Sequence, residues 1–461
     1  MNRRAPISRI VGEFASEIKL GDIPEAIRHT AKLHILDSLG VGLVSSRLAA
    51  SRSMVDALAD GSAGTHGIIG SHHKVSLSDA LLANGMLING IEYDDTSIEG
   101  RVHPNGYCTP VALWCGNEWG VGGRDILVAY IVGIEIAIRV GAASKGTFQQ
   151  RGVDIIGLSG AFGAAVLAGR LLGLDGVQMS HAQGIAHSMA AGSREFTREL
   201  ATTKALHPAW AGVCGVTAAR LARSGMIVPS EPYEGLYGLY RIMAAERFSQ
   251  CDLSLLTEGL GETWLCGQLA VKPLPACYFL IPAIDAAIAL RNQFALPLEE
   301  IRTIEVFLPR AAINTVCEPA PQRLRPQHSY AAQFSIYYSV AAALVRGRFG
   351  LEEIEAEALA DPVILDLAGK VTYREDETST FPANYTATLH VEMRDGSVYR
   401  HEEREHRGGA ARPMTEAQII EKFMANAIGT LTAENQQRVR DTVLGLESAG
   451  SVVPLLTALS P

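Results

Sequence analysis

Residues 160–175 read GAFGAAVLAGRLLGLD, and residues 123–143 read GRDILVAYIVGIEIAIRVGAA. In both stretches apolar residues recur every three to four positions, which is the period of a helix. The same spacing is found at 25–44, 76–93, 178–191 and 208–224. Glycine and alanine on these helices allow neighbouring helix axes to approach closely. The first 265 or so residues therefore predict a tightly packed helical bundle.

The pattern changes after about residue 270, where Pro273, Pro275 and Pro282 interrupt it. Alternation typical of strands appears at 302–308, 370–373, 385–393 and 397–400. Helical spacing lies between these runs, at 282–291 and 331–345, and returns from Met414 onward. We predict a mainly α protein. Its large all-helical domain begins with residues 1–268, a smaller α+β domain spans 269–408, and C-terminal helices (409–461) return to the helical domain.

Composition excludes several classes of protein. The 461 residues are 48% hydrophobic and 19% charged, with a formal net charge of −9. No stripe of lysine and arginine is present, which argues against a nucleic-acid partner. The N-terminal residues lack a signal-peptide core, and the apolar run 126–143 is interrupted by Glu135 and Arg139. We therefore expect a soluble, cytoplasmic protein without a membrane partner, in which any anionic substrate meets positive groups gathered in a cleft.

The sequence also predicts chemistry without a metal. The seven cysteines have neither CxxC nor cluster spacing, so we expect reduced thiols, with Cys214 packed in the core. The GVG at 40–42 does not follow a strand-like run, which disfavours a dinucleotide site. Gly-x-Ser-x-Gly, HExxH and P-loop signatures are absent from the sequence.

Four loops that lead into helix starts hold the candidate functional residues. The free N–H groups and dipole of a helix N-terminus suit a carboxylate ligand. The loops are NGIEYDDT (89–96) with His103-Pro104, KALHP (204–208) with Arg194 and Arg198 upstream, KPLPAC (272–277), and RGVDIIG (151–157) before a helix that Ser159 is expected to cap. The alternatives are a solvated turn, a surface lysine beside a capping histidine, an interdomain linker and a plain N-cap, in that order.

Histidine and lysine in this setting favour abstraction of a proton α to a carboxylate. That proton is weakly acidic, so a base must act beside positive groups that stabilise the developing enolate-like charge. Histidine and desolvated lysine can serve either purpose.

At these residues the chain resembles the MmgE/PrpD family, which includes 2-methylcitrate dehydratases, cis-aconitate decarboxylases and iminodisuccinate epimerases. The stretches that carry the resemblance are HILDSLGVGL (34–43), NGIEYDDT, GRDILVAYIVGIEIAIRVG (123–141), GAFGAAVLAGRLLGLD, KALHPAWAG (204–212), KPLPACYFLIPAIDAA (272–287) and AAQFSIYYSVAAAL (331–344). The resemblance implies a helical domain and an α+β domain, a homodimer, and an interdomain site without metal or organic cofactor.

Carried over by position, the family's site residues fall on Asp94 or Asp95, His103, Lys204, His207 and Lys272. Three positions depart from the family pattern. Glu92 lengthens an acid that is Asp in many members, Asp154 replaces a histidine of the family's Gly-Phe-His-Pro turn, and Cys277 stands where decarboxylases carry a histidine. We assign catalytic roles to His103, Lys204, Lys272, Asp94 and Asp154, and substrate binding to His207, Asp95, Glu92, Arg194 and Cys277.

The leading hypothesis is a lyase of the 2-methylcitrate dehydratase kind acting on a small di- or tricarboxylate. An epimerase or isomerase of an amino- or imino-dicarboxylate, such as iminodisuccinate, is the alternative, because inversion at a carbon needs two bases but no protonated leaving group. Asp154 favours that alternative, since a carboxylate is a poor proton donor at neutral pH. A cis-aconitate decarboxylase-like enzyme and a non-catalytic dicarboxylate-binding relative stay open.

Overall fold

The computed structural model describes residues 5–461 and confirms a mainly α fold. Six long helices of the bundle lie close to the predicted runs: α2 (Glu25–Ser45), α4 (Leu77–Asn89), α7 (Gly123–Ala143), α9 (Ile155–Leu171), α10 (Gly176–Met189) and α12 (Leu206–Arg223). Two more helices, α1 (Ile7–Glu17) and α3 (Ala49–Ala59), lie where the sequence had predicted no bounds. Shorter helices join them: α5 (Asn105–Pro110), α6 (Gly116–Glu118), α8 (Thr147–Gln150), α11 (Phe196–Glu199) and α13 (Leu239–Ala244).

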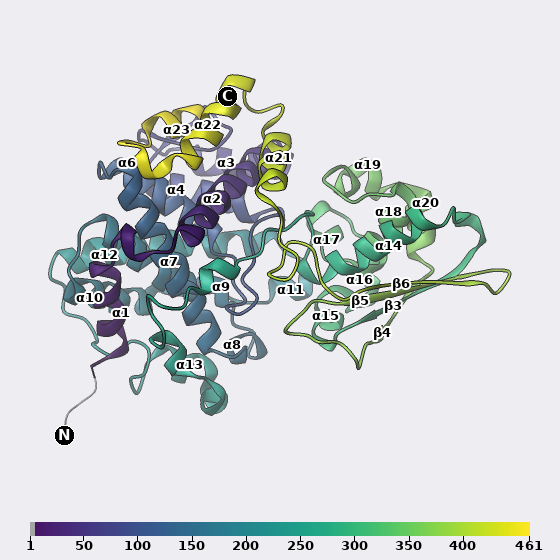
Figure 1. Cartoon of the computed structure of the whole chain (residues 1–461), viewed down its shortest axis with the longest axis horizontal. Coiled ribbons are helices and arrows are strands. Elements are labelled where there is room, and N and C mark those ends of the chain that lie inside the picture. Colours follow the sequence, from purple (N-terminus) through teal and green to yellow (C-terminus); the bar gives the residue numbers. More distant parts are fainter. Residues whose placement is uncertain (1–4) are drawn as a thin grey trace.

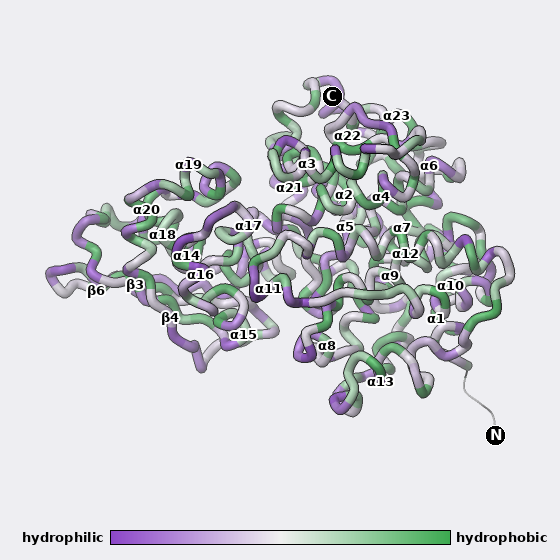
Figure 2. Tube along the Cα trace, turned by 180° about the vertical axis from the view of Figure 1, so that it is seen from behind, coloured by the Kyte–Doolittle hydropathy of each residue, from purple (hydrophilic) through white to green (hydrophobic). Residues whose placement is uncertain are grey.

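Helices α7, α9 and α12 form the centre of the bundle, and small residues let them approach. A Cβ atom added at Gly163 of α9 would lie 2.6 Å from the carbonyl oxygen of Gly133 on α7. One added at Gly215 of α12 would lie 2.4 Å from the carbonyl carbon of Ala164 on α9. Neither clash is tolerable, so close packing explains the glycines. Figure 2 shows apolar residues concentrated along these central helices.

Helix α7 is long and apolar enough to cross a membrane by length and composition alone, contrary to our expectation from the sequence. All of its apolar window is buried inside the protein, as befits a core helix. The two charged residues in the middle of the helix, Glu135 and Arg139, are paired there: Arg139 Nε lies 2.7 Å from Glu135 Oε1. The Arg139 guanidinium also donates to backbone carbonyls between residues 255 and 263, and so holds that irregular segment against the helix.

The smaller unit contains a four-stranded sheet in the order β4-β3-β5-β6. Its strands are β3 (Ile301–Leu308), β4 (Val371–Glu375), β5 (Ala387–Met393) and β6 (Val398–Glu403), all at runs that the sequence predicted as strands. β3 pairs in parallel with β4 and antiparallel with β5. Helices α14 (Ile281–Gln293), α18 (Ile336–Arg346) and α20 (Pro362–Ala368) lie beside the sheet (Figure 1). The shorter helices here are α15 (Arg310–Ala312), α16 (Ala320–Leu324), α17 (Ser329–Ala332) and α19 (Ala356–Leu359).

The chain builds two main hydrophobic cores. One joins residues 11–269 to apolar residues of 423–459, and the other is made almost entirely by residues 270–393. The C-terminal helices α21 (Glu416–Ala427), α22 (Ala433–Leu444) and α23 (Val453–Ala458) pack beside the N-terminal helices, as their yellow and purple ribbons show in Figure 1. A further two-stranded ribbon, β1 (His66–Gly67) and β2 (Lys74–Val75), lies within the helical part. The predicted boundaries at 268/269 and 408/409 themselves stay predictions.

Candidate active site

A cavity of about 540 Å³ lies where the two cores meet. The helical part contributes charged and polar groups, and the smaller part contributes mainly aromatic ones. Residues of the helical part that line the cavity include Glu92, Thr96, Arg101, His103, Asp154, Arg194 and Lys204; the smaller part contributes Cys277, Tyr278, Phe279, Phe334, Phe381 and Tyr385. Six of the ten predicted site residues line this cavity: Glu92, His103, Asp154, Arg194, Lys204 and Cys277. The other four, Lys272, His207, Asp94 and Asp95, are not among the residues that line it.

The loop between α4 and α5 supplies the largest share of the polar groups. Helix α4 ends at Asn89 rather than at the predicted Tyr93, so Glu92 lies in the loop with a left-handed backbone (φ 50°). Such a conformation is strained for a non-glycine residue, and strained residues tend to cluster at functional sites. Thr96 and Ala270 exchange two backbone hydrogen bonds of 2.9 Å, which join this loop to the 270–277 segment.

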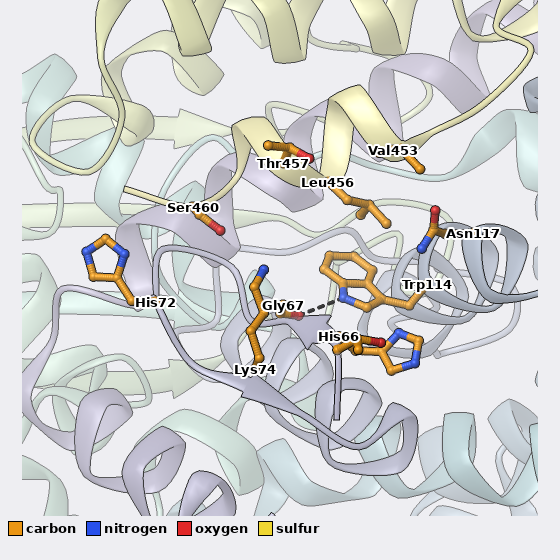
Figure 3. Close-up of a pocket in the computed structure, with 11 residues that line it drawn as sticks. His66, Gly67, His72, Lys74, Trp114, Asn117, Val453, Leu456, Thr457 and Ser460 are labelled. Carbon is orange, nitrogen blue, oxygen red and sulfur yellow. Dashed lines mark hydrogen bonds between the residues drawn. The ribbon is translucent and has the colours of Figure 1, made fainter. Parts of the chain in front are cut away.

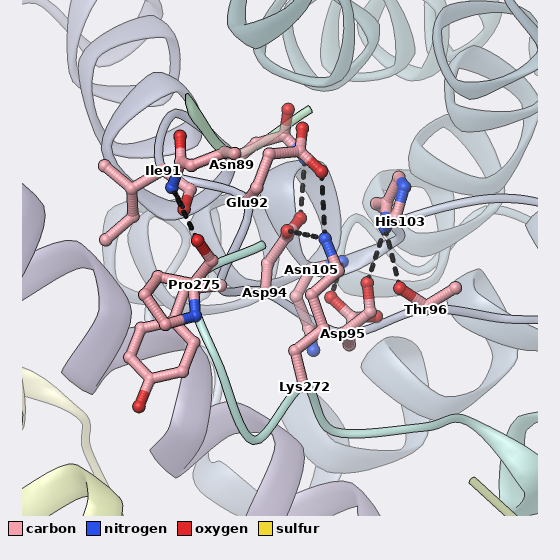
Figure 4. A network of polar contacts seen from close by, with 12 residues as sticks. Asn89, Ile91, Glu92, Asp94, Asp95, Thr96, His103, Asn105, Lys272 and Pro275 are labelled. Atoms are coloured by element: carbon pink, nitrogen blue, oxygen red, sulfur yellow. Dashed lines mark hydrogen bonds and ion pairs between the residues drawn. The ribbon is translucent and has the colours of Figure 1, made fainter. Parts of the chain in front are cut away.

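Glu92 sits between two lysines from distant parts of the chain (Figure 4 shows Glu92 and Lys272). Lys204 donates to Glu92 Oε1, and Lys272 donates to Glu92 Oε2 at 3.0 Å. All three side chains are buried. Although burial opposes ionisation, the two ammonium groups hold the pKa of Glu92 well below its usual range. Burial likewise opposes the charge on Lys272, yet Glu92 and Asp94 raise its pKa.

His103 lies immediately before α5, as predicted, and its tautomer follows from its contacts. Nδ1 is 2.6 Å from the backbone carbonyl oxygen of Asp95, and a carbonyl can only accept, so Nδ1 carries the proton. The hydroxyl of Thr96 lies 3.1 Å from the same nitrogen. Nε2 is therefore the basic nitrogen. Burial and the nearby Lys204 lower the pKa of His103 to about 4, so the imidazole is neutral near pH 7.

Asp94 and Asp95 belong to a buried polar network behind the cavity (Figure 4). Asn89 Nδ2 donates to Asp94 Oδ2 at 2.6 Å, and Asp94 Oδ1 lies 3.6 Å from the ammonium of Lys272. Asp95 Oδ1 accepts from the backbone N–H of Asn105 at 3.2 Å. Burial and the neighbouring Asp94 raise the pKa of Asp95 well above its usual value. Neither aspartate is among the residues that line the cavity, so these two hold the site from behind.

A second buried ion pair braces the loops from the C-terminal helices. Lys422 of α21 lies 2.7 Å from Asp37 of α2 and donates to the backbone carbonyls of Tyr93 and Lys272, each at 2.9 Å. One ammonium thus joins both loops that carry the Glu92–Lys272 pair. Sequence reasoning did not select Lys422, although a signal existed: it lies at helical spacing among the buried Ile419, Phe423 and Ala427.

Asp154 caps α9, which begins at Ile155, and the expectation that Ser159 caps this helix is wrong. The Ser159 hydroxyl donates to the carbonyl of Ile155 from inside the helix. Asp154 Oδ2 accepts from the backbone N–H of Gly157 at 3.4 Å and from His207 Nδ1 at 2.8 Å. His207 lies in the first turn of α12, so the pair joins two helix starts. Asp154 lines the cavity, whereas His207 stands behind it and packs edge-on against Phe196.

The remaining predicted residues, Arg194 and Cys277, both line the cavity. Burial raises the pKa of the Cys277 thiol, which therefore keeps its proton. Facing them is an aromatic cluster that sequence reasoning missed, in which the Phe279 and Phe381 rings lie 4.8 Å and 5.3 Å from the ring of Tyr385. Arg101, which has a left-handed backbone (φ 55°), was missed as well. The roles assigned to the ten predicted residues stay predictions.

A second pocket, of about 350 Å³, lies between the β1–β2 ribbon and α23 (Figure 3). Trp114 Nε1 donates to the carbonyl of Gly67 there, and His66 lies 3.4 Å from a carboxylate oxygen of Glu118. None of the ten predicted site residues lines it. Within residues 5–461, no group of three or more histidine, cysteine, aspartate or glutamate side chains is arranged to hold a metal ion.

Comparison with known proteins agrees with this architecture. The chain is similar to a cis-aconitate decarboxylase-like protein of Aspergillus oryzae, at 29% identity over 97% of this chain and 96% of the relative. It is also similar to the cis-aconitate decarboxylase of Homo sapiens (24%; 99% and 96%) and to the 2-methylcitrate dehydratase of Cupriavidus necator (25%; 89% and 88%). The MmgE/PrpD N-terminal domain model matches residues 9–250, and the C-terminal domain model matches residues 274–448. Matched over most of its length by both models, the chain belongs to the MmgE/PrpD family.

Proposed function

We propose that the protein is a lyase that removes a proton α to a carboxylate of a small di- or tricarboxylate and expels water from the neighbouring carbon. The proposal rests on the neutral, oriented imidazole of His103 at the cavity. Its Nδ1 proton is donated to the Asp95 carbonyl, its ring is neutral, and it lines the cavity beside Lys204. A neutral imidazole next to a fixed ammonium is the pairing that enolate formation needs.

The bound substrate itself makes His103 a stronger base. The pKa of His103 is about 4 partly because Lys204 and Lys272 are close. A polycarboxylate in the cavity adds negative charge beside the ring and raises the pKa of the imidazole, since an opposite charge favours the protonated form. Nε2 then takes the α proton, and the imidazolium can return it to the departing hydroxyl group. Lys204 stabilises the negative charge that develops on the substrate carboxylate.

Incubation in D₂O with citrate-, tartrate- and aspartate-type acids, followed by NMR, tests the proposal. A dehydratase loses the α-proton signal of one acid and produces a vinyl signal, and His103→Asn abolishes both changes. Release of CO₂ from an unsaturated tricarboxylate would identify a decarboxylase instead, the activity named for several relatives. Binding without any exchange of substrate protons would indicate a non-catalytic binding protein.

The second candidate function is epimerisation, and the Asp154–His207 pair favours it. This pair is a second acid–base group beside the cavity, and inversion at a carbon needs one group to remove a proton and another to add one. An epimerase incorporates deuterium without net loss of substrate. Asp154→His separates the two functions: it introduces the histidine that the family resemblance implies at this turn, so dehydration is preserved or raised, whereas epimerisation tuned around a carboxylate loses activity.

We also propose that the protein is a homodimer that forms through the outer face of α12 and the loop after it. Leu206 and Trp210 are each 43% exposed, and Ile227 is 99% exposed. Large apolar side chains grouped in this way are typical of subunit interfaces. Sedimentation should show a dimer that Trp210→Glu dissociates. A wild-type species of 49.3 kDa at micromolar concentration would contradict the proposal.

A further inference from the structure

Most charged side chains that line the cavity already have a partner of opposite charge or a backbone partner. Lys204 is bound to Glu92, Asp154 to His207, and the His103 ring to a backbone carbonyl. Arg101 and Arg194 are different. Within residues 5–461, neither guanidinium has a hydrogen bond or an ion pair, although both residues line the cavity. The positive charge that is free to meet a ligand is therefore carried by these two arginines.

The backbone places Arg101 at the cavity at some energetic cost. Its φ of 55° lies in the left-handed region, which non-glycine residues seldom adopt. Its guanidinium lies across Gly146, where an added Cβ atom would come within 1.7 Å of Arg101 Nη1. Gly146 itself lines the cavity and has a φ of 81°. Strain at one residue and a glycine at the other thus seat this side chain against the cavity.

Arg194 reaches the same cavity from another segment. It lies in the loop between α10 and α11, where its backbone N–H donates to the carbonyl of Gly152 at 2.9 Å, two residues before Asp154. The contact fixes Arg194 beside the start of α9. Arginines from two separate loops therefore line one cavity together with His103 and Lys204; Arg194 is half-buried and Arg101 is exposed.

We propose that Arg101 and Arg194 form the receptor for the substrate carboxylates that are remote from the reacting carbon, and so restrict the enzyme to acids with two or three carboxylates. A guanidinium binds a carboxylate through two parallel N–H donors, which gives direction as well as charge. Lys204, which is held by Glu92, is left to act at the reacting carbon beside His103. The inference deepens the proposed function and rests on it for the identity of the reaction, but its ligand class can be tested without turnover.

The test is calorimetric binding of three probes to the full-length protein: tricarballylate (propane-1,2,3-tricarboxylate), glutarate and butyrate. The wild-type protein should bind them with affinities that fall in that order. Arg101→Gln and Arg194→Gln should each weaken tricarballylate binding by about tenfold to a hundredfold, the value of a hydrogen bond to a charged group, and leave butyrate binding unchanged. Arg101→Lys and Arg194→Lys should recover part of the loss, because lysine keeps the positive charge but lacks the two parallel N–H donors of a guanidinium.

Arg198→Gln is the matched control, because Arg198 is exposed on α11 and does not line the cavity. It should bind all three probes like the wild-type protein. Unchanged tricarballylate binding in both glutamine variants, an equal loss for butyrate, or no binding of any probe by the wild-type protein would overturn the receptor. If the arginine dependence holds but no acid exchanges its α proton in D₂O, the lyase proposal fails and the receptor stands. If turnover is found and both glutamine variants keep the wild-type KM, the receptor proposal fails and the lyase proposal stands.

Discussion

Glu92 is expected to stabilise the fold as strongly as any single side chain of the site. It lies between two buried ammonium groups, with Lys272 Nζ 3.0 Å from Oε2. In Glu92→Gln, Lys272 keeps its contact with Asp94, at 3.6 Å, but loses the closer carboxylate, and Lys204 loses its carboxylate partner. Removing one partner from a buried ion pair costs about 3–5 kcal/mol, because the other charge is left uncompensated. Glu92→Gln should therefore lower the free energy of unfolding by that amount.

Glu92→Asp should have an intermediate effect, which can be worked out from the geometry. The aspartate side chain is shorter by one carbon–carbon bond, about 1.5 Å. If the contact with Lys204 is kept, the contact with Lys272 lengthens from 3.0 Å to roughly 4.5 Å. With an effective dielectric constant of about 20, the attraction falls from about 5.5 to about 3.7 kcal/mol, a loss of about 2 kcal/mol. Aspartate tolerates a left-handed backbone well, so the change tests length rather than strain.

Urea denaturation of the wild-type protein, Glu92→Asp and Glu92→Gln measures the order of their free energies of unfolding directly. Glu195→Gln serves as the control, because Glu195 is exposed and such changes stay within about 0.5 kcal/mol. The folded pKa of Glu92 is lowered, so its stabilisation is present above about pH 4.3, its unfolded value, and is lost as the pH falls through the folded pKa. The folded pKa of Lys272 is raised, so its contribution is present below about pH 10.4 and is lost as the pH rises beyond that. The difference in free energy of unfolding between the wild-type protein and Glu92→Gln should therefore be constant from about pH 5 to 9. Equal stability of the two proteins in this window would refute the reasoning.

Four further predictions follow from the site. The kcat/KM profile should keep its plateau down to about pH 5 and fall near pH 4, because the free enzyme's base is His103 with a pKa of about 4; a limb at the ordinary histidine value would exclude this base. Asp154→Asn keeps an oxygen for the α9 cap but changes the partner of His207, so in an epimerase that uses this pair kcat should fall at least about tenfold with little change in melting temperature; unchanged kcat would exclude the pair as the second acid–base group. Lys422→Met should lower the free energy of unfolding by about 3–5 kcal/mol, and should lower kcat because the Lys272 loop is released. Adding Asp37→Leu should restore much of the stability but not kcat. Full recovery of kcat in the double variant would show that Lys422 does not position the loop. Dialysis against a strong chelator should leave turnover unchanged, and a loss restored by added iron or magnesium would contradict the expected metal independence.

The sequence by itself determined the elements and the loops that carry the site. Helix α7 begins and ends at the predicted residues, and the strands β3 to β6 appear at the predicted runs, because helix and strand periods are local properties of the chain. The His103, Lys204 and Lys272 loops were found for a related reason: each stands just before a helix start, where the pattern breaks. The cap of α9 was misplaced by five residues, since both Asp154 and Ser159 are good N-cap residues and a local pattern does not choose between them.

Only the tertiary structure decided which charges meet. Glu92 binds lysines that lie 112 and 180 positions away in the sequence, and Lys422 reaches a carbonyl 150 positions away. Periodicity does not encode such contacts, because they depend on how the two cores are placed against each other. Among the residues that the structure describes, the same placement leaves the guanidinium groups of Arg101 and Arg194 without hydrogen-bond or ion-pair partners, while both lysines are bound to Glu92. A sequence shows which residues carry charge; the packing of distant segments decides which charges are neutralised inside the protein and which remain for a ligand.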